Sequence, residues 1–335
     1  IGVSPRAAFR HEIGYMIRSI LLDPFLLLLI GMVALASVLP ASGDGAVLVG
    51  HLSTAAIMLL FFLHGARLPH AAVRDGVLKW RLHGAVLLST YLLFPLLGVL
   101  LVRSGLAGGT MATGILFLTL VPSTVQSSIA FTSIAGGDVA AAVVSAAFSN
   151  LFGILITPLL VALLLSGSGA AMSGDAVLSI IVELLLPFVA GHLLHRRLGG
   201  FLKRHRALTL TVDRGSILLI VYAAFSHAVT MHLWDEVSAL DLLRLFGLSL
   251  VILGLVLVIT WQVGKLLGFP LQDRIVLLFC GSKKSLASGV PMAGVLFSPA
   301  ALGLAILPLM LFHQIQLIAC AIIARHLAAR GQEAP

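Results

Sequence analysis

Apolar stretches long enough to cross a lipid bilayer recur along the whole chain, and this feature restricts the possible folds more than any other. About 20 consecutive apolar residues span the hydrocarbon core as a helix. Ten such stretches fit the 335 residues, so we predict an all-α membrane protein with ten transmembrane helices. The predicted spans are 24–39, 46–66, 82–102, 111–132, 138–165, 175–195, 214–231, 242–268, 274–297 and 300–324.

Composition agrees with a single membrane-embedded unit covering 1–335, since 59% of the residues are hydrophobic and only 10% are charged. The lipid bilayer is therefore an expected partner. The formal charge of +8 does not indicate nucleic-acid binding, because the basic residues lie in short segments between apolar spans. Residues 1–20 are basic and mildly amphipathic, which suggests an interfacial helix, and 325–335 form a predicted cytoplasmic tail.

Lysine and arginine placement predicts the orientation. Seventeen of the 21 lie in segments on the same side as the N-terminus, two lie on the other side, and Lys283 and Lys284 lie within a span. Since cytoplasmic loops carry an excess of Lys and Arg, both termini are expected in the cytoplasm.

Two spans contain a polar interruption: PSTVQSS at 122–128 and GSKKS at 281–285. Each is followed by a small-residue helix, a tight turn and a long final span. We therefore predict two repeats of five helices, 24–165 and 175–324, which have inverted topology because five is odd. Broken helices at matching places in inverted repeats indicate a transporter's binding site. The alternative is a pair of Ser/Thr-rich kinks that pack helices closely.

Polar side chains at these breaks are the candidate substrate- or ion-binding groups. A break exposes backbone groups and half-helix ends, and a half-helix N-terminus favours an anion. The alternative roles are to stabilise kinks and to hold helices together. The set is Ser123, Thr124, Gln126, Ser127, Ser128, Ser282, Lys283, Lys284 and Ser285, with Asn150 and Gln314 at corresponding places in the two final helices.

Two adjacent lysines at membrane depth cost several kcal/mol unless they are paired, hydrated or facing a cavity. Lys283 and Lys284 could attract an anion, stand in for a cation, titrate, or form a structural salt bridge. Neighbours on a helix are rotated by about 100°, so their roles should differ. Glu183 is a candidate charge partner or a snorkelling helix-end residue. His313 is a candidate coupling group, although a lone histidine is more often a core residue. We predict no metal set, cofactor or nucleophile–base motif, hence no enzyme.

The stretches VPSTVQSSIAFTSIAGGDVAAAVVSAAF, FCGSKKSLASGVPMAGVLF and LLFFLHGARL resemble the bile acid:sodium symporter family. The resemblance is strongest to the branch that includes solute-carrier-family-10 member 7. It implies inverted repeats divided into a panel domain (helices 1, 2, 6, 7) and a core domain (3–5, 8–10), whose helices 4 and 9 cross as broken pairs. It also implies secondary transport in a plasma membrane, with a bacterial inner membrane expected.

The family pattern also implies two sodium ions at the crossing, and here the residues depart from it. An acidic ligand is replaced by apolar residues around Phe279, and a Gln-Asn pair by Lys283-Lys284. Two ordinary sodium sites are therefore not expected, and coupling to sodium or to protons stays open. We predict a secondary transporter of a small organic anion, with its solute and oligomeric state undefined. The alternative is a non-transporting membrane regulator related to calcium or glycosylation.

Overall fold

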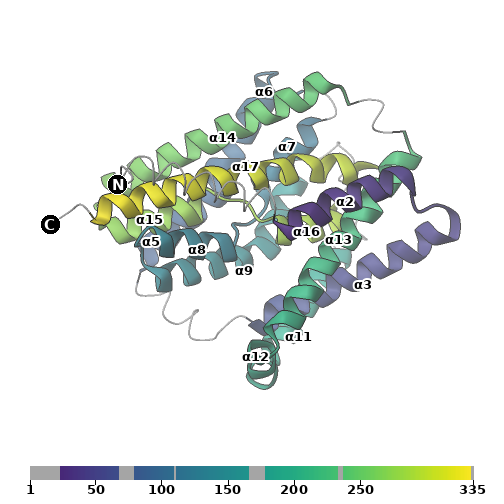
Figure 1. Cartoon of the computed structure of the whole chain (residues 1–335), viewed down its shortest axis with the longest axis horizontal. Helices are drawn as coiled ribbons and strands as arrows, with labels where there is room; N and C mark the ends of the chain where they lie inside the picture. The colour runs from purple at the N-terminus through teal and green to yellow at the C-terminus, as the bar shows by residue number, and fades with distance from the viewer. Residues whose placement is uncertain (1–22, 68–78, 109–110, 166–177, 233–236, 333–335) are drawn as a thin grey trace, which may run out of the picture.

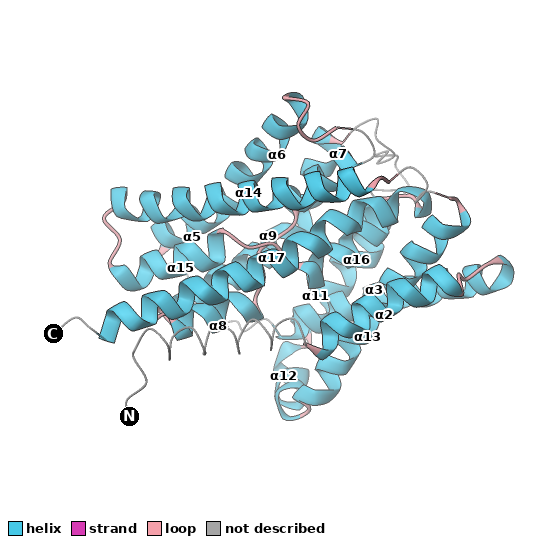
Figure 2. Cartoon of the chain, turned by 45° about the horizontal axis from the view of Figure 1, so that its top comes forward, coloured by secondary structure: helices cyan, strands magenta, loops and turns pink. Residues whose placement is uncertain are grey.

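A computed structural model of the chain describes residues 23–67, 79–108, 111–165, 178–232 and 237–332. Within these ranges all regular secondary structure is helical (Figure 2). The predicted interfacial helix at 1–20 lies outside the described residues. The elements are α2 (Pro24–Val38), α3 (Gly43–Arg67), α5 (Trp80–Leu88), η1 (Ser89–Leu93), α6 (Phe94–Arg103), α7 (Met111–Leu120), α8 (Gln126–Ile134), α9 (Val139–Leu164), η2 (Ile180–Leu185), α11 (Leu186–Leu193), α12 (His195–Arg204), α13 (Arg206–Thr230), α14 (Ala239–Leu266), α15 (Leu271–Gly281), α16 (Leu286–Leu296) and α17 (Pro299–Gln332).

Long apolar helices dominate the described part of the chain and indicate a multi-pass membrane protein. Six are long and apolar enough to cross a bilayer, and three shorter ones are also apolar. Helix is found within every predicted span. The bounds differ most where the chain is basic: α13 begins at Arg206 rather than 214, and α17 continues to Gln332 through most of the predicted tail. Arg and Ala are strong helix formers, so these ends extend beyond the apolar runs.

Two spans change register ahead of a proline. The π-helical turns η1 and η2 end just before α6 and α11, whose second residues are Pro95 and Pro187. The Phe94 N–H donates to the Ser89 carbonyl, and the Leu186 N–H donates to the Ile181 carbonyl. Proline has no N–H and clashes with the carbonyl four residues earlier, so a wider turn accommodates it. The sequence did not predict this change of register.

Helices α3 and α11 touch through their backbones, on the same side of the molecule as α12 and α13 (Figure 1). A Cβ added at Gly65 would lie 2.0 Å from the Phe188 carbonyl oxygen, and one at Gly191 would lie 2.0 Å from that of Phe62. Only glycine fits at either position. Helix α13 packs against α2 and α3, and on its other side against α16 and α17.

An ionic contact joins the starts of three helices on the opposite side. Lys79, just before α5, lies 2.8 Å from the Asp138 carboxylate and 2.6 Å from that of Asp273 in the first turn of α15. Asp138 also accepts a hydrogen bond from the Ala141 N–H and thereby caps α9. The bond from Lys79 lowers the pKa of Asp138. Burial opposes the charge on Lys79, but the two carboxylates outweigh it and raise its pKa.

Candidate functional site

Two helical segments are interrupted where the sequence predicts breaks. Helix α7 ends at Leu120 and α8 begins at Gln126, while α15 ends at Gly281 and α16 begins at Leu286. We call residues 121–125 the first break and 282–285 the second break. They lie against each other, because the Ser285 N–H donates to the Pro122 carbonyl at 2.8 Å. The breaks themselves are confirmed, and they meet inside the protein.

Hydroxyl groups satisfy the carbonyls at the broken end of α15. Such carbonyls have no partner within the helix, and leaving them unpaired in a dry interior is costly. Three serine hydroxyls donate to these carbonyls, and two of them, Ser123 and Ser128, belong to the predicted set. The Thr124 hydroxyl lies 2.8 Å from the Ser127 hydroxyl and 2.9 Å from the Ser128 hydroxyl. The pairs are Ser128 Oγ to Phe279 O (3.0 Å), Ser123 Oγ to Cys280 O (2.6 Å) and Ser89 Oγ to Gly281 O (2.8 Å).

Asn150, on α9, connects the two broken segments. Its side-chain amide donates to the Ser123 carbonyl at 2.9 Å and to the Ala146 carbonyl at 3.0 Å, and its oxygen accepts from Ser288 Oγ at 2.6 Å. The preceding residue, Ser149, accepts a hydrogen bond from the Ser123 N–H at 2.9 Å. The structure therefore brings Asn150 to the crossing, where it forms structural hydrogen bonds.

An amide on α17 that pairs with the second break is Gln316, which was not among the candidates. Gln316 is fully buried, accepts a bond from the Lys284 N–H and donates to the Lys284 carbonyl, both at 2.8 Å. The candidate Gln314 is half-buried, and its side chain makes no hydrogen bond to the described residues. Two residues along a helix turn a side chain by about 200°, so Gln314 and Gln316 lie on different faces of α17. A binding role for Gln314 stays a prediction.

Lys284 is completely buried, and its ammonium group contacts three backbone carbonyls. The distances from Nζ are 2.8 Å to Thr90 O, 2.7 Å to Thr119 O and 2.8 Å to Val121 O. The nitrogen also lies 4.2 Å from the centre of the Phe94 ring, a cation–π contact. We call the three carbonyl oxygens the carbonyl cage.

These carbonyls are available because each lacks its usual helical donor. In the π register of η1 the partner of the Thr90 carbonyl would be the N–H of residue 95, which is proline. The Ser123 N–H, which an unbroken helix would direct at Thr119, bonds Ser149 instead. Val121 lies in the first break. The ammonium group thus satisfies unpaired carbonyls from two segments at once.

Lys283 is equally buried but much less well paired. Its ammonium nitrogen lies 3.3 Å from Ser127 Oγ and over the rings of Phe131 and Phe279, at 4.3 and 5.7 Å. Of its three N–H groups, one has a hydrogen-bond acceptor among the described residues. The two lysines therefore differ in their surroundings, as expected, but both lie in the non-helical second break, so helical rotation is not the reason.

Three of the remaining candidates lie in or beside the second break, and the fourth, Glu183, lies in η2. Ser282 Oγ donates to the Leu278 carbonyl at 2.5 Å, and Ser285 Oγ accepts from the Ser288 N–H and caps α16. His313 Nδ1 lies 2.9 Å from Gln316 Nε2 and 3.5 Å from the Lys284 carbonyl. Glu183 is half-buried in η2, and no ion pair joins it to Lys283 or Lys284 among the described residues.

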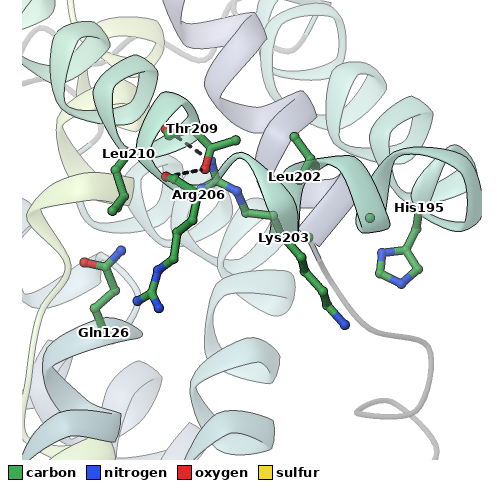
Figure 3. A pocket seen from close by; sticks show the side chains of 9 residues that line it. Gln126, His195, Leu202, Lys203, Arg206, Thr209 and Leu210 are labelled. Atoms are coloured by element: carbon green, nitrogen blue, oxygen red, sulfur yellow. Dashed lines mark hydrogen bonds between the residues drawn. The ribbon is translucent and has the colours of Figure 1, made fainter.

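A basic pocket of about 370 Å³ lies between α12, α13 and the start of α8 (Figure 3). Arg206 from α13 and Gln126 from α8 point into the same space. Arg67 is held at the wall by Asp213 at 2.5 Å and by the Thr209 carbonyl at 3.3 Å. None of the described residues that line the pocket is acidic. Its lining residues are Arg67, Gln126, His195, Gly199, Leu202, Lys203, Arg206, Thr209 and Leu210.

Comparison with known proteins identifies the family. The model of the SBF-like CPA transporter family matches residues 23–329. The chain belongs to this family. Family relatives include the putative symporter YfeH of Escherichia coli, 48% identical over 307 residues that cover 91% of this chain and 92% of the relative. An uncharacterized protein, PA2026 of Pseudomonas aeruginosa, is 50% identical over 315 residues, 93% and 95% of the two chains.

A more distant family relative confirms the resemblance to bile acid:sodium symporters. Sodium/bile acid cotransporter 7 of rat is 26% identical over 273 residues, which cover 78% of this chain and 79% of the relative. Relatives named as symporters or cotransporters are transport proteins and not enzymes, and they act on small molecules across membranes. These names do not favour the alternative of a non-transporting regulator.

Sequence reasoning on this family member missed residues whose role depends on backbone groups. Thr90 contributes a carbonyl, Ser149 and Ser89 cap broken ends, and Gln316 holds the second break. One signal was present in the sequence: Pro95 follows Thr90 by five residues, and a proline has no N–H to pair with the Thr90 carbonyl in a π-helical turn. The basic residues of the pocket were used only to predict orientation, since their convergence with Gln126 depends on how α8, α12 and α13 pack.

Proposed function

We propose that this protein is a secondary active transporter of a small organic anion that works by alternating access. The observation that carries the proposal is the basic pocket, whose lining includes Gln126 at the start of α8, next to Ser127, which contacts Lys283. Lys203 and Arg206 line the pocket, and the buried Lys283 contacts the residue that follows Gln126. Clefts lined by one sign of charge concentrate ligands of the opposite sign.

The architecture that we propose has two inverted five-helix repeats, 24–165 and 175–324. The panel domain would contain α2, α3, α11 and α13, and the core domain the remaining spans with both breaks. The packing of α3 with α11, and of α13 with α2 and α3, supports this division. The pocket lies where panel residues face Gln126 of the core, so movement of one domain against the other would open and close it.

Lys283 is the group that we assign to the transported anion. It is buried, it carries unused N–H donors, and it lies one residue from the carbonyl-bound Lys284. An anion that advanced past Gln126 would supply the missing acceptors. An ammonium group bonds an anion more strongly than a neutral hydroxyl, because both partners then carry charge, so Ser127 would be displaced. Lys283 is also a candidate proton carrier, because its one hydrogen-bond partner, the neutral hydroxyl of Ser127, does not hold it in the charged form.

The pocket faces the cytoplasm in this proposal. The helices that form its outer wall contain the densest group of basic residues in the chain, and such segments remain on the cytoplasmic side. Both termini are then cytoplasmic, and the expected location is a bacterial inner membrane. The conformation described is one in which the anion enters or leaves on the cytoplasmic side.

The test compares two pocket residues with a matched control. Purified protein would be heated in detergent with chloride alone or with succinate, citrate or methanesulfonate added. We expect one of these organic anions to raise the melting temperature, and Lys203→Gln and Arg206→Gln to reduce that rise. Arg204→Gln removes the same charge next to Lys203 but lies outside the pocket lining, so it should retain the response.

The same variants would then be reconstituted in liposomes for uptake of the stabilising anion. Uptake should fall with Lys203→Gln and Arg206→Gln, while Arg204→Gln should behave as the parent protein. Equal loss in all three variants would show that only the general surface charge matters, and it would contradict a binding role for the pocket.

A further inference from the structure

The carbonyl cage has the composition of a cation site. Three oxygen atoms from the η1 turn and from the end of α7 and the first break converge within 2.8 Å of one point. Rings of backbone carbonyls replace the hydration shell of ions in selective pores, because their partial negative charge favours cations. The C-terminal end of α7 adds to this preference through its helix dipole.

The cage requires that the Lys284 side chain be a cation. An ammonium group has three N–H donors and no acceptor, and here it has three carbonyl partners. A neutral amine would have two donors and a lone pair, and the lone pair would face the third carbonyl. The number of donors therefore equals the number of acceptors only in the charged form. No N–H group of Lys284 then remains to bind a substrate.

A sodium ion does not fit this site while Lys284 occupies it. Sodium would need the same three oxygen atoms, and two cations so close in a buried site repel strongly. We propose that the Lys284 ammonium group is a built-in cation, which takes the place of a sodium ion at the crossing and makes the protein independent of sodium there. This deepens the proposed function, since it assigns the coupling site, but the cation replacement can be tested without transport.

The first test measures the melting temperature of the purified full-length protein in sodium chloride and in choline chloride. The parent protein should show the same melting temperature in both salts. Lys284→Ala leaves three buried carbonyls without a donor and should lower the melting temperature by roughly 5 °C or more in choline chloride. Sodium or methylammonium should recover at least about half of that loss by entering the cage.

Lys283→Ala is the matched control, because it removes the same side chain from the neighbouring position, where no carbonyl cage exists. It should show no recovery with sodium or methylammonium. Equal recovery in both variants would contradict a specific cation site at the cage. Sodium-dependent stabilisation of the parent protein would overturn the proposal, because the cage would then bind sodium beside the lysine.

A second measurement decides the question if Lys284→Ala does not fold. The parent protein and Lys284→Gln would be compared for binding of radioactive sodium. Binding to the parent should be undetectable. Saturable sodium binding to the parent would overturn the proposal. None of these outcomes depends on an organic anion, so a failure of the proposed anion transport would be distinguished from a failure of this inference.

Discussion

Replacing Gln316 by leucine should destabilise the crossing, whereas the same change at Gln314 should not. Gln316 is fully buried and pairs with both backbone groups of Lys284 at 2.8 Å. Each buried group left unpaired costs about 1–3 kcal/mol, so the two together cost about 2–6 kcal/mol. Burial of the leucine side chain returns about 1.5–3 kcal/mol. His313 lies 3.5 Å from the carbonyl, too far to replace the lost bond fully.

The net loss at Gln316 is therefore about 2 kcal/mol, which corresponds to a fall of roughly 4 °C in melting temperature. Gln314→Leu loses no recorded hydrogen bond and should stay within about 1 °C of the parent. Thermal unfolding in detergent, monitored by intrinsic fluorescence, measures both variants under the same conditions. Equal shifts for the two variants, or a larger shift for Gln314→Leu, would refute the assignment of Gln316 to the second break.

Two other perturbations test the packing outside the crossing. Lys79→Met should lower stability by about 1 kcal/mol, a small value because the lysine is partly exposed. The bond from Lys79 lowers the pKa of Asp138 in the folded protein. The stabilisation that this bond provides is therefore present at neutral pH and is lost as the pH falls through the pKa of Asp138. The melting temperatures of the parent and of Lys79→Met should converge in acid. Gly191→Ala places a Cβ 2.0 Å from the Phe62 carbonyl oxygen and should lower the free energy of unfolding by about 1–3 kcal/mol or more. Gly200 has open space around it, so Gly200→Ala should leave the melting temperature unchanged in the same thermal assay.

The sequence predicted the helical architecture and both breaks because hydrophobicity alone decides them. An apolar run must be helical in a bilayer, since its backbone has no other hydrogen-bonding partner. The short polar runs around Ser123 and Lys283 are too polar to continue such a helix without special support. Their positions could therefore be predicted without knowing how the helices pack.

Which side chains meet at the crossing could be predicted only in part. Ser123, Ser128 and Asn150 lie at the breaks, where they were expected, but Gln316, which pairs with the Lys284 backbone, was not among the candidates. In two weakly similar repeats an offset of two residues changes the helix face, so the sequence could not single out Gln316. The pocket was missed for another reason: Arg206 and Gln126 are 80 residues apart in sequence, and only the tertiary packing brings them together.

The different surroundings of Lys283 and Lys284 have one origin in the backbone. A proline at position 95 and a break after α7 leave carbonyls without donors, and those carbonyls bind the ammonium group of Lys284. Among the described residues no comparable set of unpaired carbonyls lies near Lys283, because hydroxyl groups already satisfy the end of α15. A lysine side chain thus fills the gap left by one break, while hydroxyl groups fill that left by the other. In the function proposed above, this asymmetry leaves the Lys283 side chain for a mobile anion while Lys284 occupies the carbonyl cage.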